Sequence, residues 1–320
     1  MSRRTRPVPA LFQSARDGDR GALARLLSLV ERGGPEAREI SRLSYPESGS
    51  GYTVGLTGAP GAGKSTLTSA TIGHLRSLGE EVAVLAIDPS SPFTGGAILG
   101  DRVRMQDHAT DPGVFIRSMA TRGHLGGLSL ATPEAARLPD AVGKRWILVE
   151  TVGVGQVEVE IAGKADTTVV VVNPGWGDAV QANKAGLMEI ADVFVINKAD
   201  RKGVEETHRD LEQMLELSDL ADDAWRPPVL AVVATERTGV PELWDTVLRH
   251  REHLVATGEL AARREFRLRE ELREIVARRL EQRAREIVTP ERWSTLQADV
   301  LDRRLDPWAA ADEMLGGVGA

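Results

Sequence analysis

The sequence contains no cysteine, which excludes a disulfide scaffold, zinc sites built from thiolates, iron–sulfur clusters and cysteine nucleophiles. Aromatic residues make up only 4% of the 320 residues, so a core must be built mainly from Val, Leu, Ile and Ala. Those residues suit strands buried on both faces and the helices that cover them. Lysine is scarce too: only 6 of the 40 basic residues are Lys, so each lysine is a candidate for a specific role.

Long hydrophobic runs are also missing, since none reaches the ~18 residues that a membrane-spanning helix needs. Residues 1–10 are basic, but the apolar segment of a signal peptide does not follow them. The formal net charge of -7 makes the chain a poor candidate for non-specific binding to nucleic acid. We therefore expect a soluble cytoplasmic protein that associates with neither membranes nor nucleic acid.

The length corresponds to about two domains at roughly 150 residues each, and 42% hydrophobic residues permit a sizeable core. Near the beginning, Leu23, Leu26, Leu27 and Val30 have the spacing of one helix face, and a second short helix is expected over 36–43. We expect an N-terminal helical segment over residues 1–50, a central domain over 51–255 and a C-terminal helical arm over 256–320.

The central zone alternates short apolar runs with helical patterns. The runs are rich in β-branched residues and do not alternate with polar ones, as is typical of strands buried on both faces; they cover 52–57, 82–87, 114–117, 146–149, 167–172, 193–196 and 229–233. Helices are predicted between them, for example over 65–78, 179–189 and 241–255. This order predicts an α/β fold with a mostly parallel central sheet.

The third zone is helical and highly charged. An apolar stripe predicts one unusually long amphipathic helix over about 261–288, formed by Leu268, Leu272, Ile275, Val276, Leu280 and Ile287. Two interpretations remain open: the helix packs on its own domain, or it is an arm that packs on a second copy of the chain.

One segment matches the phosphate-loop pattern G-x-x-x-x-G-K-[ST], directly after a predicted strand and before a predicted helix. Glycines let backbone N–H groups surround phosphates, and the helix N-terminus adds positive charge. Lys64 is expected to contact the β- and γ-phosphates, and Ser65 is expected to bind Mg²⁺. The predicted phosphate-binding residues are Gly58, Ala59, Pro60, Gly61, Ala62, Gly63, Lys64, Ser65 and Thr66.

A second motif, N-K-x-D, follows the predicted strand 193–196 and indicates guanine. The carboxylate of Asp200 accepts from the guanine N1–H and amino groups, and adenine would leave it unpaired. Asn197 is expected to hold the loop, and the stem of Lys198 to cover the base. After the last strand, Ala234, Thr235 and Glu236 are expected to offer a backbone N–H to the guanine oxygen.

The segment Glu150-Thr-Val-Gly153 occupies the position of the D-x-x-G motif of GTPases, with Glu150 expected near the metal and Gly153 near the γ-phosphate. Val154 stands where GTPases of the Ras type carry a water-orienting Gln, and an apolar side chain cannot orient water. Gln156, two residues further on, is the candidate for that role. We expect slow intrinsic hydrolysis of GTP that a partner accelerates.

Further acidic residues are metal or switch candidates. Asp88 and Asp101 are expected metal ligands; the alternatives are a turn residue for Asp88 and a solvated helix start for Asp101. Asp178 ends a loop that follows the strand 167–172, and Lys184 lies in the next helix. This loop is expected near the nucleotide as a further switch, unless it is a plain connection.

With these motifs placed, the chain resembles the methylmalonyl-CoA mutase-associated GTPases (the MeaB/ArgK family, with human MMAA as a relative). The matching segments are 58–66, 87–101, the sequence Val149-Glu-Thr-Val-Gly-Val-Gly-Gln156, and 173–178 through 188–192 to 197–200. The resemblance spans about residues 10–310. The segment 117–127 departs from the family, so it assigns no role to Arg122 and His124.

The resemblance implies a GTP-driven chaperone of adenosylcobalamin-dependent acyl-CoA mutases that gates cofactor loading and helps to eject damaged cobalamin. It implies a homodimer joined through the C-terminal helices, and GTP hydrolysis that the mutase accelerates. By motif, Lys64 and Ser65 contact phosphate and Mg²⁺, whereas Asp88, Asp101 and Glu150 form the acidic metal shell. Gln156 lies in a second switch, Asp178 and Lys184 lie in a third, and Asp200 reads guanine.

Two other functions remain as alternatives. A metal-delivery GTPase would need a cluster of ligands, but the chain has no Cys and its six His form no cluster in the sequence. His250 and His253 are spaced as neighbours on a helix, and we expect them to be a surface pair. The second alternative, a kinase acting on a transport protein, fits poorly with a guanine-reading motif.

Overall fold

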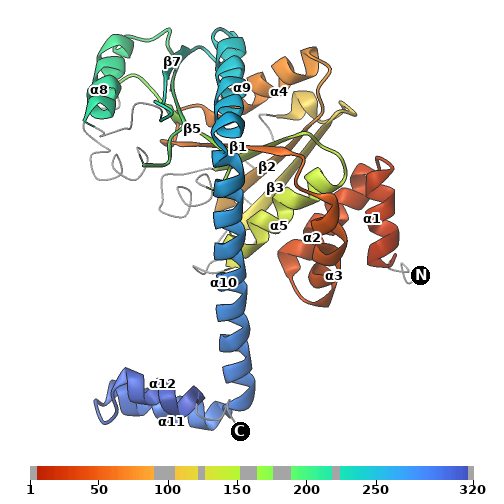
Figure 1. The fold of residues 1–320 in the computed structure, drawn as a ribbon, viewed down its shortest axis with the longest axis vertical. Helices are drawn as coiled ribbons and strands as arrows, with labels where there is room; N and C mark the ends of the chain where they lie inside the picture. The colour runs from red at the N-terminus through yellow and green to blue at the C-terminus, as the bar shows by residue number, and fades with distance from the viewer. Residues whose placement is uncertain are drawn as a thin grey trace. The chain divides into compact units, whose positions relative to one another are not determined.

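The computed structural model describes residues 6–89, 105–121, 127–151, 164–175, 189–217 and 224–315. The chain divides into two compact units, Met1–Arg263 and Arg264–Ala320. The first unit contains a seven-stranded sheet with helices around it, and the second consists of helices (Figure 1). No helix in these described ranges is long and apolar enough to cross a membrane.

The sheet has the strand order β3-β2-β4-β1-β5-β6-β7, and every described strand pair is parallel. Its strands are β1 (Tyr52–Gly58), β2 (Val82–Pro89), β3 (Val114–Thr121), β4 (Trp146–Thr151), β5 (Thr167–Val172), β6 (Val193–Asn197) and β7 (Val229–Val232). The predicted α/β fold is therefore confirmed, and each predicted apolar run forms a strand. Because β1 lies at the centre, the loop that follows it is flanked by other strand ends.

One face of the sheet is covered by α4 (Lys64–Ser77), α8 (Val204–Glu216) and α9 (Val240–Thr257). Along β2, Val82, Val84 and Ala86 pack into the core on this face, whereas the alternate residues Ala83 and Leu85 pack into the other. This alternation follows from the period of two along a strand. The predicted helices 65–78 and 241–255 are confirmed, while the helix predicted over 179–189 lies, except for Glu189, outside the described residues.

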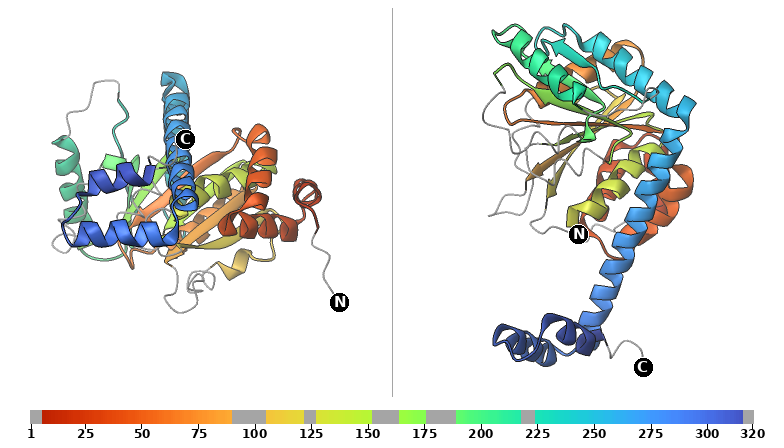
Figure 2. Two further views of the ribbon diagram at one scale, coloured as in Figure 1. Left: turned by 90° about the horizontal axis from the view of Figure 1, so that it is seen from below. Right: turned by 60° about the vertical axis from the view of Figure 1, so that its left-hand side comes forward.

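The opposite face is covered by α1 (Val8–Arg16), α2 (Arg20–Arg32), α3 (Pro35–Ser44) and α5 (Gly127–Ala141). The views in Figure 2 show α1, α2 and α3 together beside α5. Asp19 caps α2, since its carboxylate accepts from the backbone N–H groups of Gly21 (2.9 Å) and Ala22 (3.1 Å). The apolar face predicted for this helix is buried, and Leu26 and Leu27 are both 0% exposed.

The helix α5 was not anticipated from the sequence. It contains Pro133 and Pro139, and proline lacks the N–H that an internal helical position donates. Short 3₁₀ turns complete the first unit at η1 (Tyr45–Glu47) and η2 (Gln106–His108).

At the amino-terminal edge of the sheet, several buried polar side chains contact one another in a row. His250 is one of them, so the expectation that it lies on the surface was wrong. This residue is 0% exposed rather than on the surface, and its Nδ1 lies 2.8 Å from the hydroxyl of Thr167. The same hydroxyl lies 2.7 Å from the phenol oxygen of Tyr52. The reason is the position of His250 on α9, where it continues the apolar face formed by Val247 and Leu254.

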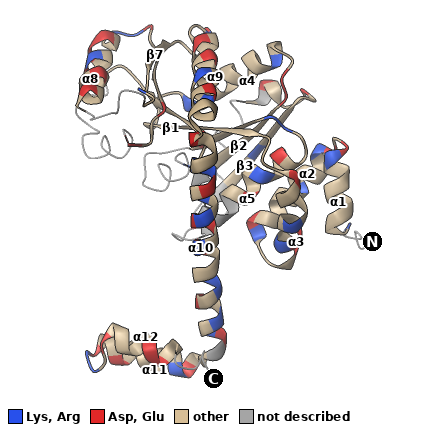
Figure 3. Ribbon diagram, viewed as in Figure 1, with Lys and Arg blue, Asp and Glu red and all other residues tan. Residues whose placement is uncertain are grey.

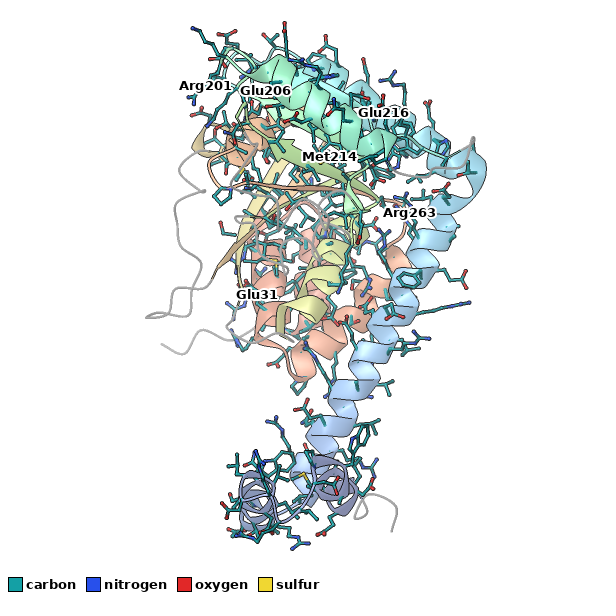
Figure 4. All side chains as sticks on the ribbon, turned by 90° about the vertical axis from the view of Figure 1, so that its left-hand side faces the viewer. Glu31, Arg201, Glu206, Met214, Glu216 and Arg263 are labelled. Carbon is teal, nitrogen blue, oxygen red and sulfur yellow. The ribbon has the colours of Figure 1, made fainter. Side chains whose placement is uncertain are left out.

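Asp192, directly before β6, lies at the other end of this row of polar side chains. One carboxylate oxygen, Oδ1, lies 3.2 Å from Nε2 of His250 and 3.0 Å from the guanidinium of Arg263, which is labelled in Figure 4. Burial alone would raise the pKa of Asp192, but His250, Arg263 and the N–H of Thr168 outweigh it, so this pKa lies below its usual range. Trp225 covers the cluster and donates its indole N–H to the Asp192 carbonyl at 2.7 Å.

The long predicted helix is confirmed as α10 (Glu259–Ile287), which begins in the first unit and continues into the second. Charged residues of both signs recur along it (Figure 3). Four residues of its predicted apolar stripe are exposed within the single chain, namely Leu268 (41%), Leu272 (61%), Val276 (47%) and Leu280 (53%), whereas Ile275 is half-buried. The second unit also contains α11 (Pro290–Leu301) and α12 (Pro307–Leu315), which are joined by an ion pair between Arg292 and Glu313.

Candidate functional site

The predicted phosphate loop runs from the end of β1 to the first turn of α4, and two of its glycines are required by geometry. Gly58 has φ +134, and a Cβ there would lie 2.0 Å from the carbonyl oxygen of Val171 on β5. Gly63 has φ +90, and a Cβ there would lie 2.4 Å from the side-chain nitrogen of Asn197. Any larger residue would displace one of these neighbours as well as strain the backbone.

Lys64 is the first residue of α4 and is only 6% exposed. Its ammonium donates to the carbonyl oxygens of Gly58 (2.8 Å) and Ala59 (3.0 Å), so it lies curled within the loop. The N-cap residue of this helix is Gly63, which has no side chain with which to cap it. A helix N-terminus and a lysine therefore face the same loop, and both favour a bound anion.

Ser65 and Glu150 meet beside this loop. The hydroxyl of Ser65 donates to Oε1 of Glu150 at 2.5 Å, and the two residues are 5% and 0% exposed. Glu150 is the penultimate residue of β4, the strand next to β1. Two buried side-chain oxygens thus lie together at the position where the sequence predicts a metal.

The other predicted metal and switch residues lie largely outside the described part of the chain. Asp88 is placed by its backbone near the end of β2, the neighbour of β4, but its side chain is not described. Asp101, Gln156, Asp178 and Lys184 lie outside the described residues, as do Arg122 and His124. Within the described residues, no group of three or more His, Cys, Asp or Glu side chains is arranged to hold a metal ion.

The N-K-x-D segment is attached directly to the phosphate loop. Asn197 is 2% exposed; its amide nitrogen donates to the carbonyl of Ala62 at 2.8 Å, and its amide oxygen accepts from the N–H of Ala234 at 3.2 Å. Lys198 has φ 59 and donates to the carbonyl of Gly61 at 2.6 Å. Asp200, two residues further on, is exposed to solvent.

In the segment after β7, the backbone N–H groups of the three predicted residues differ in their hydrogen bonds. The N–H of Ala234 donates to Asn197, and that of Glu236 donates to the carbonyl of Val233 at 3.0 Å. The N–H of Thr235 makes no hydrogen bond with any residue that the structure describes. Of the three predicted residues, Thr235 is therefore the candidate whose backbone N–H is available to a ligand.

The structure thus joins a phosphate loop between β1 and α4 to an N-K-x-D loop at the carboxyl edge of a parallel sheet, and this arrangement defines a P-loop GTPase. Asn197 and Lys198 both link the two loops directly. The chain belongs to the methylmalonyl-CoA mutase-associated GTPases, because the model of the family described as Methylmalonyl Co-A mutase-associated GTPase MeaB matches residues 23–289.

Individual relatives agree with the family assignment. A protein of Pyrococcus abyssi, whose name describes it only provisionally as a GTPase, is 50% identical over 316 residues, or 97% of this chain and 98% of its own. GTPase ArgK of Escherichia coli is 41% identical over 252 residues, covering 77% of this chain and 76% of its own. The mitochondrial methylmalonic aciduria type A homolog of Mus musculus is 36% identical over 275 residues, covering 81% and 66%.

A solved structure matches over nearly the whole length. The crystal structure described as LAO/AO transport system kinase has a TM-score of 0.73 and 28% sequence identity, and the match covers 98% of each chain. The fold and the resemblance that the sequence predicted are both confirmed.

Proposed function

We propose that the protein is a GTP-hydrolysing chaperone for an adenosylcobalamin-dependent acyl-CoA mutase, most simply methylmalonyl-CoA mutase. In this role it gates the loading of the cofactor and protects or reactivates the mutase from its place in the cytoplasm. The observation that carries the proposal is the family match over residues 23–289, whose description names the mutase. The geometry at the carboxyl edge of the sheet supports the guanine nucleotide that such a function uses.

The base is proposed to lie beside Asn197 and Lys198. Because both side chains are hydrogen-bonded to the phosphate loop, a nucleotide whose phosphates occupy that loop would hold its base within reach of Asp200. Asp200 would accept from the guanine N1–H and amino groups, while the N–H of Thr235 would donate to the guanine oxygen. Adenine lacks this donor pair and would leave the carboxylate unpaired.

Magnesium fits the residues that meet next to the phosphate loop. The hydroxyl of Ser65 and the carboxylate of Glu150 are hard oxygen ligands, which this ion prefers, and both are buried beside Lys64. When bound, the ion would neutralise charge on the β- and γ-phosphates. We propose that Ser65, Asp88, Asp101 and Glu150 hold it directly or through water, and that Lys64 contacts the phosphates.

The attacking water has no obvious acceptor in the sequence next to Gly153, since Val154 is apolar. We propose that Gln156 orients the water after the partner binds, and that Asp178 and Lys184 form a further switch near the γ-phosphate. Slow hydrolysis alone and faster hydrolysis with the mutase follow from this arrangement.

A homodimer formed through the C-terminal helices is proposed from the exposed stripe on α10. Phe266 is 64% exposed, Leu272 61% and Leu280 53%, and a row of large apolar side chains on one helix is typical of a protein–protein contact. Of the two interpretations of this helix, the exposed stripe favours an arm that packs on a second copy.

Binding to the client tests the proposal. Purified chain and purified methylmalonyl-CoA mutase are mixed with GDP or with a non-hydrolysable GTP analogue, and complex formation is followed by analytical ultracentrifugation. We expect a complex whose affinity depends on the nucleotide. No complex with either nucleotide would contradict the mutase assignment; stoichiometric binding of Ni²⁺ or Zn²⁺ by the same sample would favour the metal-delivery alternative, and phosphate transfer to protein the kinase alternative.

A further inference from the structure

Two threonine hydroxyls connect the strand that carries the phosphate loop with the strand that carries Glu150. Thr57 directly precedes Gly58 at the end of β1, and Thr151 is the last residue of β4. The two strands are parallel neighbours with Leu56 opposite Glu150, so Thr57 and Thr151 occupy the next position on each. The hydroxyl of Thr151 donates to the hydroxyl of Thr57 at 3.0 Å.

Both side chains are 0% exposed, so neither hydroxyl can exchange its partner for solvent. The Thr151 hydroxyl also lies 3.4 Å from the carbonyl of Leu56, a longer contact with the same strand. Burying a hydroxyl costs free energy unless it is hydrogen-bonded, and Val would fill a similar volume without that cost. The pair therefore adds a directional link between the two strand ends that apolar packing alone would not supply.

Each of the two threonines is the sequence neighbour of a residue at the predicted nucleotide site. On β1, the next residue is Gly58, whose carbonyl accepts from the ammonium of Lys64. On β4, the preceding residue is Glu150, which accepts from Ser65. The residue after Thr151 begins the segment that contains Gly153, the γ-phosphate contact expected from the sequence.

We propose that Thr57 and Thr151 form a positioning pair that holds the carboxyl end of β4, from which the predicted γ-phosphate segment starts, at a fixed distance from the phosphate loop. Neither residue touches the nucleotide; the pair acts through Gly153 and Glu150. It favours GTP over GDP, because only the triphosphate uses the γ-phosphate contact. This inference rests on the proposed roles of the phosphate loop and of Gly153.

The test compares Thr151→Val, Thr57→Val, the double variant and Thr151→Ser. Affinities for GDP and for a non-hydrolysable GTP analogue are measured at saturating Mg²⁺ by titration calorimetry, and the free energy of unfolding is measured in urea. We expect Thr151→Val to weaken binding of the GTP analogue about three- to tenfold more than binding of GDP, which is the size expected for the loss of one hydrogen bond. Thr151→Ser keeps the hydroxyl and should restore the ratio to within about twofold.

The double variant shows whether the two threonines act together or independently. When both hydroxyls are absent, neither is left unsatisfied, so the double variant should be no less stable than Thr151→Val, and its loss of GTP preference should equal that of the single variant. Thr71→Val is the matched control, because Thr71 is 4% exposed and its hydroxyl donates within α4, to the carbonyl of Leu67, and to no other described residue. It should leave the GTP/GDP ratio unchanged.

Equal weakening of both nucleotides by Thr151→Val, no change in either, or no rescue by Thr151→Ser would overturn the positioning role and leave the pair as ordinary core packing. These outcomes differ from failure of the proposed function. If the site itself were wrong, the unsubstituted chain would bind neither guanine nucleotide, and that result would overturn both the function and the inference.

Discussion

The hydroxyl of Ser65 lies 2.5 Å from Oε1 of Glu150, and the two side chains come from different parts of the fold. Ser65 lies in the first turn of α4, whereas Glu150 is placed by β4 in the centre of the sheet. The extra methylene of Glu, compared with Asp, contributes to its reach from the strand to the helix. Such a pair of buried oxygens is the feature that ties the magnesium proposal to the structure.

Replacing Glu150 with Gln keeps the size of the side chain and removes its charge. We expect the Mg²⁺ concentration for half-maximal GTP hydrolysis to rise about 10- to 100-fold, because a buried charged ligand is replaced by a neutral one. The control is Glu212→Gln, which removes a carboxylate that pairs with Arg226 on the surface. An unchanged Mg²⁺ requirement would mean that Glu150 is not part of the metal site.

The substitution Asp200→Asn tests how the base is read. The Asp200 side chain is exposed to solvent, so the fold and its thermal midpoint should not change. The affinity for GTP should fall about 10- to 100-fold, since two charge-assisted hydrogen bonds to guanine are lost or weakened. Asp210→Asn, on the exposed side of α8, is the control. GTP affinity equal to that of the unsubstituted chain would remove the guanine assignment.

Tyr52 gives a prediction for alkaline pH. Burial raises the pKa of Tyr52 to about 12, and Asp166 and Asp192 add to the rise, whereas Thr167 and Arg251 oppose it. The folded state therefore favours the neutral phenol. This contribution to stability is full below pH 10, the usual pKa of a tyrosine, and is lost as the pH rises through about 12.

The titration can be observed directly because the chain contains only 2 tyrosines. In a Tyr45→Phe background, the absorbance change near 295 nm reports Tyr52 alone. We expect its midpoint near pH 12 in the folded protein and near pH 10 in denaturant. A midpoint near 10 while the far-ultraviolet circular dichroism is still native would contradict the buried environment of this phenol.

The arm is tested by placing charge in its apolar stripe. Leu272→Glu together with Leu280→Glu should convert a dimer into monomers, because two carboxylates would have to be buried without partners in the interface. Arg273→Ala is a matched control on the same helix, where Arg273 is 76% exposed and pairs with Glu270. Light scattering gives the mass, and a dimer that survives both substitutions would reject the arm.

Sequence patterns were sufficient to predict the structure wherever one physical cause dominates. Strands β4, β5 and β6 are buried along their whole length, so apolar runs such as 167–172 predict their structure without ambiguity. The phosphate loop was equally predictable, since Gly58 and Gly63 are forced by backbone geometry.

Contacts between distant segments were not predictable in the same way. His250 was wrongly placed on the surface, although its spacing from Val247 and Leu254 carried a signal that it continues a buried face. The bond between Thr57 and Thr151 left no signal, because threonine in a strand is expected for its β-branched shape alone. The helix α5 was missed because Pro133 and Pro139 conceal its period.

The most direct measurement is the rate of GTP hydrolysis by the chain alone and with purified methylmalonyl-CoA mutase. We predict a slow rate alone, on the order of 10⁻⁴ to 10⁻² s⁻¹, the range between GTPases without a catalytic arginine and those that carry one in cis. Addition of the mutase should raise it at least about tenfold, and Lys64→Ala should remain at background in both cases. A fast rate in the absence of any partner, or a slow rate that the mutase does not change, would contradict a mutase-stimulated GTPase.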